Sequence, residues 1–445
     1  MFPYFADLAN SSVPRYTSYP TAAEFRDGVT PEIHGAALDA IAPGTPVSLY
    51  LHVPFCRQIC WYCACNTSAI GSEQRLHAYV DALLSEIATV GARMRGSVSS
   101  IHFGGGSPNA LSVADLGRLL EQAHKCFRWE DKADVAMELD PRLLTEDVID
   151  GLLSLGLTRA SLGVQTFAPH VQSRINRVQS FGSVAESVER LRGGVDGINF
   201  DLLYGLPAQT EADVAATIER TLELAPSRIA VFGYAHVPHM MPRQQMIATS
   251  ELPGSVERFR QSVVAHEHLT AGGYAAIGFD HFAAPTDSLA RAAARSMVKR
   301  NFQGFTDDPA GIVVGMGSSA ISMFPGLLAQ NEKRGGFYRR STKQGALATA
   351  RGVARTAEDR FRGAIIEQLL CQSRCDVAAI AEEHAQDPAS VIPAFDRLAF
   401  FAERGLVTLD GWRVALSVAA RPYARSIASA FDAYRNPAAR FSKAV

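Results

Sequence analysis

The sequence has little that would hold it to a membrane or to nucleic acid. Its 445 residues carry 43 Lys and Arg against 45 Asp and Glu, and charges of one sign do not form runs. A chain with so little net charge has weak nonspecific attraction for nucleic acid or anionic lipid. The N-terminal segment MFPYFADLANSSVPRYTSYP lacks the basic start, apolar centre and cleavage site of a secretory signal. We therefore expect a cytoplasmic protein that binds no nucleic acid.

Long hydrophobic runs, internal repeats and low-complexity segments are lacking as well. The longest uncharged stretch, residues 310–329, has the length of a membrane span, but it contains four glycines and Pro325. Helix breakers at this density favour buried loops around a site, so we expect no membrane span. A hydrophobic fraction of 47% in a chain of this length is instead typical of a globular protein of two or three domains.

Cysteine is also scarce, but four of the seven cysteines fall within ten residues: Cys56, Cys60, Cys63 and Cys65. Thiols in a reducing cytosol are metal ligands or redox groups more often than disulfides. Zinc sites typically use two separated C-x2–4-C pairs, and no second pair follows at a suitable distance. The other three cysteines, Cys126, Cys371 and Cys375, are interpreted as buried apolar side chains. Cys371 and Cys375 are expected on one face of a helix.

The spacing C-x3-C-x2-C over Cys56, Cys60 and Cys63 favours an iron–sulfur cluster. Three thiolates can hold three irons of a [4Fe–4S] cube and leave the fourth without a protein ligand. Such an iron can chelate amino and carboxylate groups of a substrate and pass an electron to it. The loop resembles that of the radical S-adenosylmethionine enzymes. This resemblance implies that the three cysteines are the cluster ligands and that Cys65 is an extra thiol beside it.

An alternation of strand-like and helix-like segments between residues 48 and 285 indicates the fold. Ser112 and Thr210 are predicted to cap two of the helices. Strands alternating with helices favour a parallel sheet, and uninterrupted apolar strands favour one covered on both faces. Six strands, fewer than the eight of a closed barrel, predict an α/β fold with an open partial (β/α)6 barrel. The strand-like segments are SLYLHV, SSIHFG, DVAMELD, RASLGVQ, GINFDLLYG and RIAVFGYAHV.

The alternation of strand-like and helix-like segments ends, and a different pattern follows after about residue 350. Three helix-like segments are followed by LVTLDGWRVAL, which we interpret as a hairpin turning at Asp410-Gly411. This pattern predicts a smaller, mostly helical, winged-helix-like C-terminal domain. The predicted units are an N-terminal arm over the active site, a partial barrel, a barrel extension with a connecting segment, and the C-terminal domain: residues 1–47, 48–285, 286–350 and 351–445.

Unusual residues follow the predicted strands, where a barrel of this kind places its chemistry. The run Gly104-Gly105-Gly106-Ser107-Pro108 lets backbone approach a ligand and suits the methionine end of S-adenosylmethionine, although a tight turn also explains it. Carboxylates at strand ends are costly without partners. Ribose hydroxyls, an ammonium group or a structural ion pair would supply these partners. The polar residues at the ends of strands three, four and five are Glu138, Gln165 and Asp201.

Nearly the whole chain resembles the oxygen-independent coproporphyrinogen III oxidases. The resemblance rests on a series that includes PRYTSYPTAAEF, LYLHVPFCRQICWYCACN, HFGGGSPNAL, ELDPR, INRVQ, NFDLLYGLPAQT, GFDHFAAP and GMGSSAISM. It implies two bound S-adenosylmethionine molecules and catalytic roles for Cys65 and Tyr50. The residues implied to contact the first molecule are Tyr50, Gly105, Glu138 and Ile321. Those implied to contact the second are Tyr62, Gly106, Ser107, Gln165, Arg177, Asp201 and Ala235.

The implied reaction is oxidative decarboxylation of two propionate side chains of coproporphyrinogen III to vinyl groups, which gives protoporphyrinogen IX. A 5′-deoxyadenosyl radical would start it, and a one-electron reductant such as a flavodoxin would supply the electron. The resemblance implies a monomer, and we take Arg15 as the first candidate for holding a propionate. Two residues depart from the family pattern: Ala64 replaces a usual Gly, and Gly233 replaces a frequent Asn.

Three alternatives stay open on the residues alone. The first is a related radical enzyme acting on another tetrapyrrole. The second is a haem-binding chaperone of the same superfamily, for which the candidate axial ligands are His236, His239 and His281. The third is a winged-helix regulator that senses redox state through the cluster. It would need a basic recognition helix, whereas VIPAFDRLAFFAERGL is largely apolar.

Overall fold

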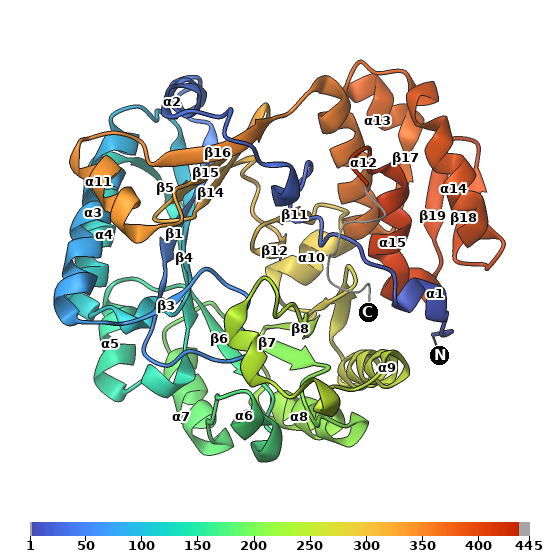
Figure 1. The fold of residues 1–445 in the computed structure, drawn as a ribbon, viewed down its shortest axis with the longest axis horizontal. Helices are drawn as coiled ribbons and strands as arrows, with labels where there is room; N and C mark the ends of the chain where they lie inside the picture. Colours follow the sequence, from blue (N-terminus) through green and yellow to red (C-terminus); the bar gives the residue numbers. More distant parts are fainter. Residues whose placement is uncertain (1, 436–445) are drawn as a thin grey trace.

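A computed structural model describes residues 2–435, and its centre is one sheet of twelve strands (Figure 1). Six consecutive strands are parallel neighbours, as predicted for the partial barrel. Their C-terminal ends therefore meet at one edge. The six strands are β1 (Pro46–Val53), β4 (Ser97–Gly105), β5 (Arg128–Leu139), β6 (Arg159–Gln165), β7 (Gly197–Tyr204) and β8 (Arg228–Gly233).

Helices connect these strands and cover the outer face of the sheet (Figure 1). The predicted caps form. Ser112 accepts a hydrogen bond from the Asp115 amide at 3.0 Å, and Thr210 forms a reciprocal capping box with Asp213. The connecting helices are α3 (Glu73–Gly91), α4 (Val113–Cys126), α5 (Glu146–Ser154), α6 (Pro169–Arg174), α7 (Phe181–Arg192), α8 (Glu211–Leu224) and α9 (Ser255–Ala271).

The prediction that the strands are covered on both faces is wrong for β6 and β7. Along β7, buried Ile198, Phe200 and Leu202 alternate with partly exposed Asn199 and Asp201. The buried side chains pack under the helices, whereas the other face lines a cavity. The inner face of these two strands therefore carries polar side chains.

The sheet extends beyond the six strands at both edges. Strand β13 (Ile312–Met316) pairs parallel to β1, and antiparallel strands follow it. Residues 310–329, predicted as buried loops, therefore contain strands, and those in β13 and β15 are buried throughout. No helix within residues 2–435 is both long and apolar enough to cross a bilayer. The added strands are β14 (Ile321–Phe324), β15 (Leu327–Asn331), β16 (Thr349–Ala354), β10 (His281–Ala283) and β9 (Ala275–Ile277).

The C-terminal part combines helices with a three-stranded sheet, consistent with the predicted winged-helix-like arrangement. Asp410 pairs with Arg413, so the hairpin turns at Gly411 and Trp412, one residue later than predicted. The last ten residues of the predicted domain, 436–445, lie outside the described residues. The elements are α12 (Ala357–Gln372), β17 (Arg374–Asp376), α13 (Val377–Glu383), α14 (Ile392–Ala402), β18 (Val407–Asp410), β19 (Arg413–Leu416) and α15 (Ala424–Ala428).

The three cysteines outside the loop only partly match their prediction. Cys371 in α12 and Cys375 in β17 are buried, but they do not share a helix face because α12 ends at Gln372. Cys126, at the end of α4, is only half-buried and lies 3.3 Å from Gln122 Nε2.

The N-terminal arm runs between the barrel and the C-terminal helices (Figure 1). It contains the short helix α1 (Ala6–Ala9), and its Tyr16 and Tyr19 are buried among C-terminal side chains. Tyr16 donates to Asp432 Oδ2 at 2.9 Å, and the Tyr19 hydroxyl accepts from the Ala433 amide at 2.8 Å. The arm is thus anchored at several points along its length.

Candidate functional site

A cavity of about 360 Å³ lies at the C-terminal ends of the parallel strands. The structure brings most of the predicted site residues together on its wall. Tyr50 and Ile321 are not on that wall. The Tyr50 hydroxyl lies 3.0 Å from His52 Nδ1, and Ile321 is in β14. The predicted residues on the wall are Cys56, Cys60, Tyr62, Cys63, Cys65, Gly105, Gly106, Ser107, Glu138, Gln165, Arg177, Asp201 and Ala235.

The glycine run packs against the start of the cysteine loop. The Gly106 amide donates to Val53 O and the Ser107 amide to Phe55 O, both at 2.8 Å. A Cβ atom on Gly106 would lie 2.6 Å from Phe55 O, so only glycine permits this approach. The run therefore fixes the position of the loop as well as bordering the cavity.

Gly105 also positions a carboxylate. Its φ is +110°, and its amide donates to Glu138 Oε2 at 3.0 Å. His102 Nε2 lies 3.4 Å from Glu138 Oε1. Burial raises the pKa of Glu138, but His102 and the Gly105 amide outweigh it, so the pKa is lowered. Glu138 is a negative charge on the cavity wall.

Asp201 places a second carboxylate on the cavity wall. It accepts hydrogen bonds from Ser161 Oγ at 3.1 Å and Asn199 Nδ2 at 3.0 Å. Burial, followed by the charge of Glu138, raises the pKa of Asp201 above its usual value, and these two donors offset only part of the rise. Gln165 also lines the cavity, with a φ of +67°, which is strained for a residue with a side chain. The neutral donors leave Asp201 able to accept from a further hydroxyl or ammonium group.

Two guanidinium groups flank Cys60. Arg177 Nη1 lies 3.3 Å and Arg142 Nη2 3.6 Å from its sulfur, and both arginines also pair with Asp140. Burial alone would lower the pKa of Arg177. Tyr62, Asp140 and Cys60 raise the pKa by more than burial lowers it, so it is raised overall. Arg177 is therefore already engaged with protein groups. Asp140 and Arg142 were missed from the sequence, although the quoted segment ELDPR contains them.

The other thiols differ in their tendency to ionise. A hydrogen bond from Cys65 lowers the pKa of Cys63 to about 6. Arg243 and Thr67 also lower this pKa, whereas burial raises it. Burial raises the pKa of Cys56 to about 11, although Ser107 partly offsets it. The same contact with Cys63 raises the pKa of Cys65. Cys65 is thus a protonated thiol at neutral pH.

Polar contacts hold the cysteine loop against the rest of the barrel. The Trp61 amide donates to Ile175 O at 3.0 Å, and Asn176 Nδ2 donates to Ile59 O at 2.9 Å. The fully buried Gln244 donates to Tyr62 O at 2.9 Å and Ala235 O at 3.0 Å. The sequence offered no signal for Gln244, because its partners are backbone atoms and one of them is far away in the chain.

The donor set fits an iron–sulfur cluster. Cys56, Cys60 and Cys63 are free thiols that face one cavity, and the cations around Cys60 and Cys63 stabilise thiolate charge. Within residues 2–435 no three Cys, His, Asp or Glu side chains are close enough together to bind a single metal ion. The fit therefore rests on the donors and their surroundings.

Comparison with known proteins is consistent with this site. Residues 50–221 match the family model described as the Radical SAM superfamily. The chain is 43% identical to the oxygen-independent coproporphyrinogen III oxidase of Bradyrhizobium diazoefficiens, over 97% of this chain and 98% of that one. It is 37% identical to that of Escherichia coli, over 98% and 95%. The solved coproporphyrinogen III oxidase of Escherichia coli superposes with a TM-score of 0.91 at 36% identity, covering 98% of this chain and 100% of that one.

The partial barrel, with its cysteine loop at the strand ends, therefore defines a radical S-adenosylmethionine enzyme. Similarity to the relatives extends over nearly the whole chain, including the N-terminal arm and the C-terminal helices. The chain belongs to the oxygen-independent coproporphyrinogen III oxidase family.

Proposed function

We propose that this protein is a coproporphyrinogen dehydrogenase of haem biosynthesis. It converts two propionate side chains of coproporphyrinogen III to vinyl groups without oxygen and so forms protoporphyrinogen IX. The observation that carries this proposal is the cavity that joins three loop thiols to the carboxylates on the strand ends, in a chain similar to its relatives over almost its full length.

Cys56, Cys60 and Cys63 would hold the [4Fe–4S] cluster of this enzyme class. When bound, the cluster supplies the electron that splits S-adenosylmethionine into methionine and a 5′-deoxyadenosyl radical, which removes hydrogen from the propionate. The chain's contribution is to orient the reactants and exclude water and oxygen. Cys65, a protonated thiol on the cavity wall, is available as a hydrogen donor.

The carboxylates suit the polar groups of S-adenosylmethionine, of which we propose that two molecules bind. Glu138 offers a charge to an ammonium group of the first molecule, and Asp201 accepts from ribose hydroxyls of the second. Tyr62 borders the same space and offers a ring face. Arg177 lines the same cavity and remains a proposed contact of the second molecule, while its contacts with Asp140 and Cys60 also position the cluster loop.

Several further expectations remain part of the proposal. The substrate is coproporphyrinogen III, and a one-electron reductant such as a flavodoxin delivers the electrons. The enzyme acts as a monomer in the cytoplasm, where free thiols and a reduced cluster persist. Its working units are the arm, barrel, extension and C-terminal domain at residues 1–47, 48–285, 286–350 and 351–445.

The geometry does not favour the haem-binding alternative. The candidate axial ligands are not on the cavity wall: His281 Nδ1 lies 2.6 Å from Asp280, and His236 Nδ1 lies 2.9 Å from Tyr234 Oη. His239 is likewise not among the lining residues.

Product analysis under strict anaerobiosis tests the proposal. Reconstituted protein is incubated with dithionite, S-adenosylmethionine and coproporphyrinogen III, and the products are separated by chromatography. We expect protoporphyrinogen IX together with methionine and 5′-deoxyadenosine. Cleavage of S-adenosylmethionine without a vinyl product would contradict the substrate assignment. Tight haem binding without cleavage would support the chaperone instead.

A further inference from the structure

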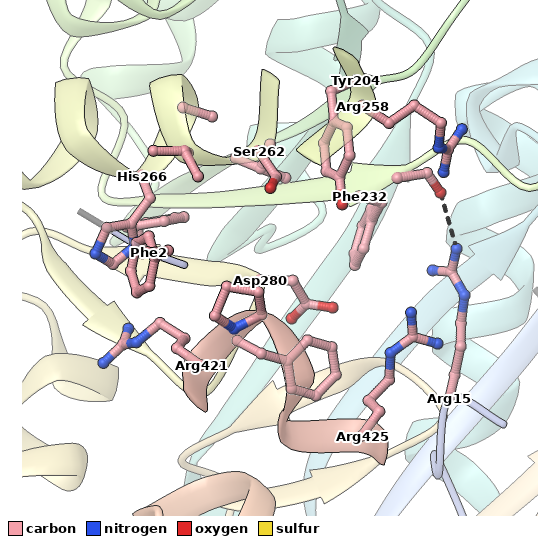
Figure 2. Close-up of a pocket in the computed structure, with 17 residues that line it drawn as sticks. Phe2, Arg15, Tyr204, Phe232, Arg258, Ser262, His266, Asp280, Arg421 and Arg425 are labelled. Carbon is pink, nitrogen blue, oxygen red and sulfur yellow. Dashed lines mark hydrogen bonds between the residues drawn. The ribbon is translucent and has the colours of Figure 1, made fainter. Parts of the chain in front are cut away.

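A second cavity, of about 70 Å³, adjoins the cluster cavity (Figure 2). The two share Arg15, Phe232 and Gly233, and Arg15 Nη2 donates to Gly233 O at 3.2 Å. Elements far apart in the sequence build the second cavity: the N-terminal arm, β8, α9 and the C-terminal residues before and within α15. A ligand that spans both cavities would pass the shared residues.

The wall of this second cavity is rich in positive charge. Among the described residues that line it there are four arginines and one acidic residue, Asp280; the arginines are Arg15, Arg258, Arg421 and Arg425. Asp280 Oδ1 lies 2.6 Å from His281 Nδ1, so part of its charge is already engaged. In Figure 2, Arg15, Arg258 and Arg425 gather at one end, and Arg421 lies at the other, near Phe2 and His266.

These cations are held in surroundings that oppose their charge. Burial and the charge of Arg15 lower the pKa of Arg425 to about 10, and burial lowers that of Arg421. The Arg421 side chain has no hydrogen bond or ion pair within the part of the chain that the structure describes. An anionic ligand would lower the electrostatic energy of such a group.

Aromatic side chains also line this cavity. They include Tyr204, Phe232, Phe279 and Phe282. Aromatic faces pack against flat apolar rings, while guanidinium groups bind carboxylates in a planar fork. The combination therefore suits a polyacid that carries small aromatic rings, such as the pyrrole rings of a porphyrinogen.

Apart from Arg15, which the two cavities share, the arginines of the cluster cavity are held by protein groups, and Arg243 donates to Thr67 Oγ1 at 2.6 Å. The wall of the cluster cavity carries Glu138 and Asp201, which would repel an anion. Its arginines near the cluster, Arg142 and Arg177, are engaged with Asp140 and Cys60. A substrate with several propionates must find its counter-charges elsewhere.

We propose that the arginine-lined cavity holds the propionates of the tetrapyrrole that are not being decarboxylated, while the reacting propionate reaches past Phe232 and Gly233 toward the cluster. This inference rests on the proposed function and names the substrate subsite that serves it. The arm completes the cavity. Arg300 holds it by donating to Arg15 O at 3.2 Å, and Phe2 packs edge-on against His266 at 4.9 Å.

Arg421→Gln is the most informative substitution, because Arg421 is half-buried and replacing it leaves the contacts of the arm intact. Arg421→Lys keeps the charge, and Arg15→Gln tests the other end of the cavity. Arg413→Gln serves as the matched control, since that side chain is 72% exposed on the C-terminal hairpin. Affinity is measured by fluorescence with coproporphyrin III, the oxidised counterpart of the substrate, and with its tetramethyl ester, which has no carboxylates.

We expect Arg421→Gln and Arg15→Gln each to weaken coproporphyrin binding by about tenfold, as loss of a charged hydrogen bond does. In both variants the KM for coproporphyrinogen III should rise, and this rise should be larger than any decrease in kcat. Arg421→Lys should recover part of the affinity, Arg413→Gln should match the unmodified protein, and the ester should bind weakly to all.

Two results separate this inference from the proposed function. If the unmodified protein forms protoporphyrinogen IX while both glutamine variants bind coproporphyrin as tightly as it does, the subsite is refuted and the function stands. If binding depends on the arginines but no vinyl product forms, the subsite is supported and the function is refuted.

Discussion

Replacing Gly105 with alanine tests how the glycine run shapes the site. The new Cβ would lie 2.4 Å from His52 Cε1. The His52 ring cannot easily move, because Tyr50 Oη lies 3.0 Å from its Nδ1 and Asn66 O lies 3.2 Å from its Nε2. The residue also has a φ of +110°, which a side chain disfavours. Both effects act on the segment whose amide holds Glu138.

The two contributions can be separated with a second glycine. Gly156 has a φ of +82°, but a Cβ atom added there would have no other atom within 4 Å, so Gly156→Ala measures backbone strain alone. Left-handed strain costs about 1–2 kcal/mol. Overpacking adds roughly 1–3 kcal/mol. Gly105→Ala should therefore destabilise the protein by about 2–5 kcal/mol, against about 1–2 kcal/mol for Gly156→Ala.

Urea denaturation followed by tryptophan fluorescence compares the two variants with the unmodified protein. Gly105→Ala should also raise the KM for S-adenosylmethionine, because Glu138 loses its fixed position, whereas Gly156→Ala should not. Equal destabilisation by the two substitutions, with unchanged KM in both, would refute the reasoning about close packing at Gly105.

Three further predictions concern the thiols, the second carboxylate and a buried histidine. Cys56→Ala should lose its iron, whereas Cys65→Ala should keep it and lose turnover by about 10²-fold, as removal of a proton donor does; iron loss from the Cys65 variant would overturn the three-ligand assignment. Asp201→Asn should retain iron but raise the KM for S-adenosylmethionine roughly tenfold, and unchanged kinetics would mark Asp201 as structural. Burial lowers the pKa of His34 from 6.5 to about 4 in the folded protein. Between pH 6.5 and 4 the unfolded chain therefore binds more protons than the folded one, so the stability of the fold decreases as the pH drops through this range. This loss should reach about 3 kcal/mol and be absent in His34→Gln, and identical pH profiles of unfolding would disprove it.

The fold was predictable where apolar runs and turn residues agree, and less so where glycines occur inside strands. The six parallel strands were recognised because each is a short segment rich in apolar residues that alternates with helix-like segments. Strand β13 was missed because of its glycine. A Cβ atom on Gly315 would lie 2.4 Å from Ile321 O, so glycine is there to let β14 approach closely, and not to break a strand.

The site was predictable as a group of residues but not as a set of contacts. Residues at successive strand ends come together in any parallel sheet, which is why Glu138 and Asp201 share a cavity. The pairing of Arg177 with Cys60 joins positions 117 residues apart, and no local pattern encodes it. A charged residue's type can thus be read from sequence, whereas its partner depends on the packing.

Spectroscopy of the anaerobically reconstituted protein tests the central claim most directly. The claim is that three side chains hold the cluster and leave one iron open. We predict about four iron atoms per chain and an electron paramagnetic resonance signal of the reduced cluster that changes when S-adenosylmethionine is added. A zinc centre, or a cluster signal that does not respond to S-adenosylmethionine, would contradict the account.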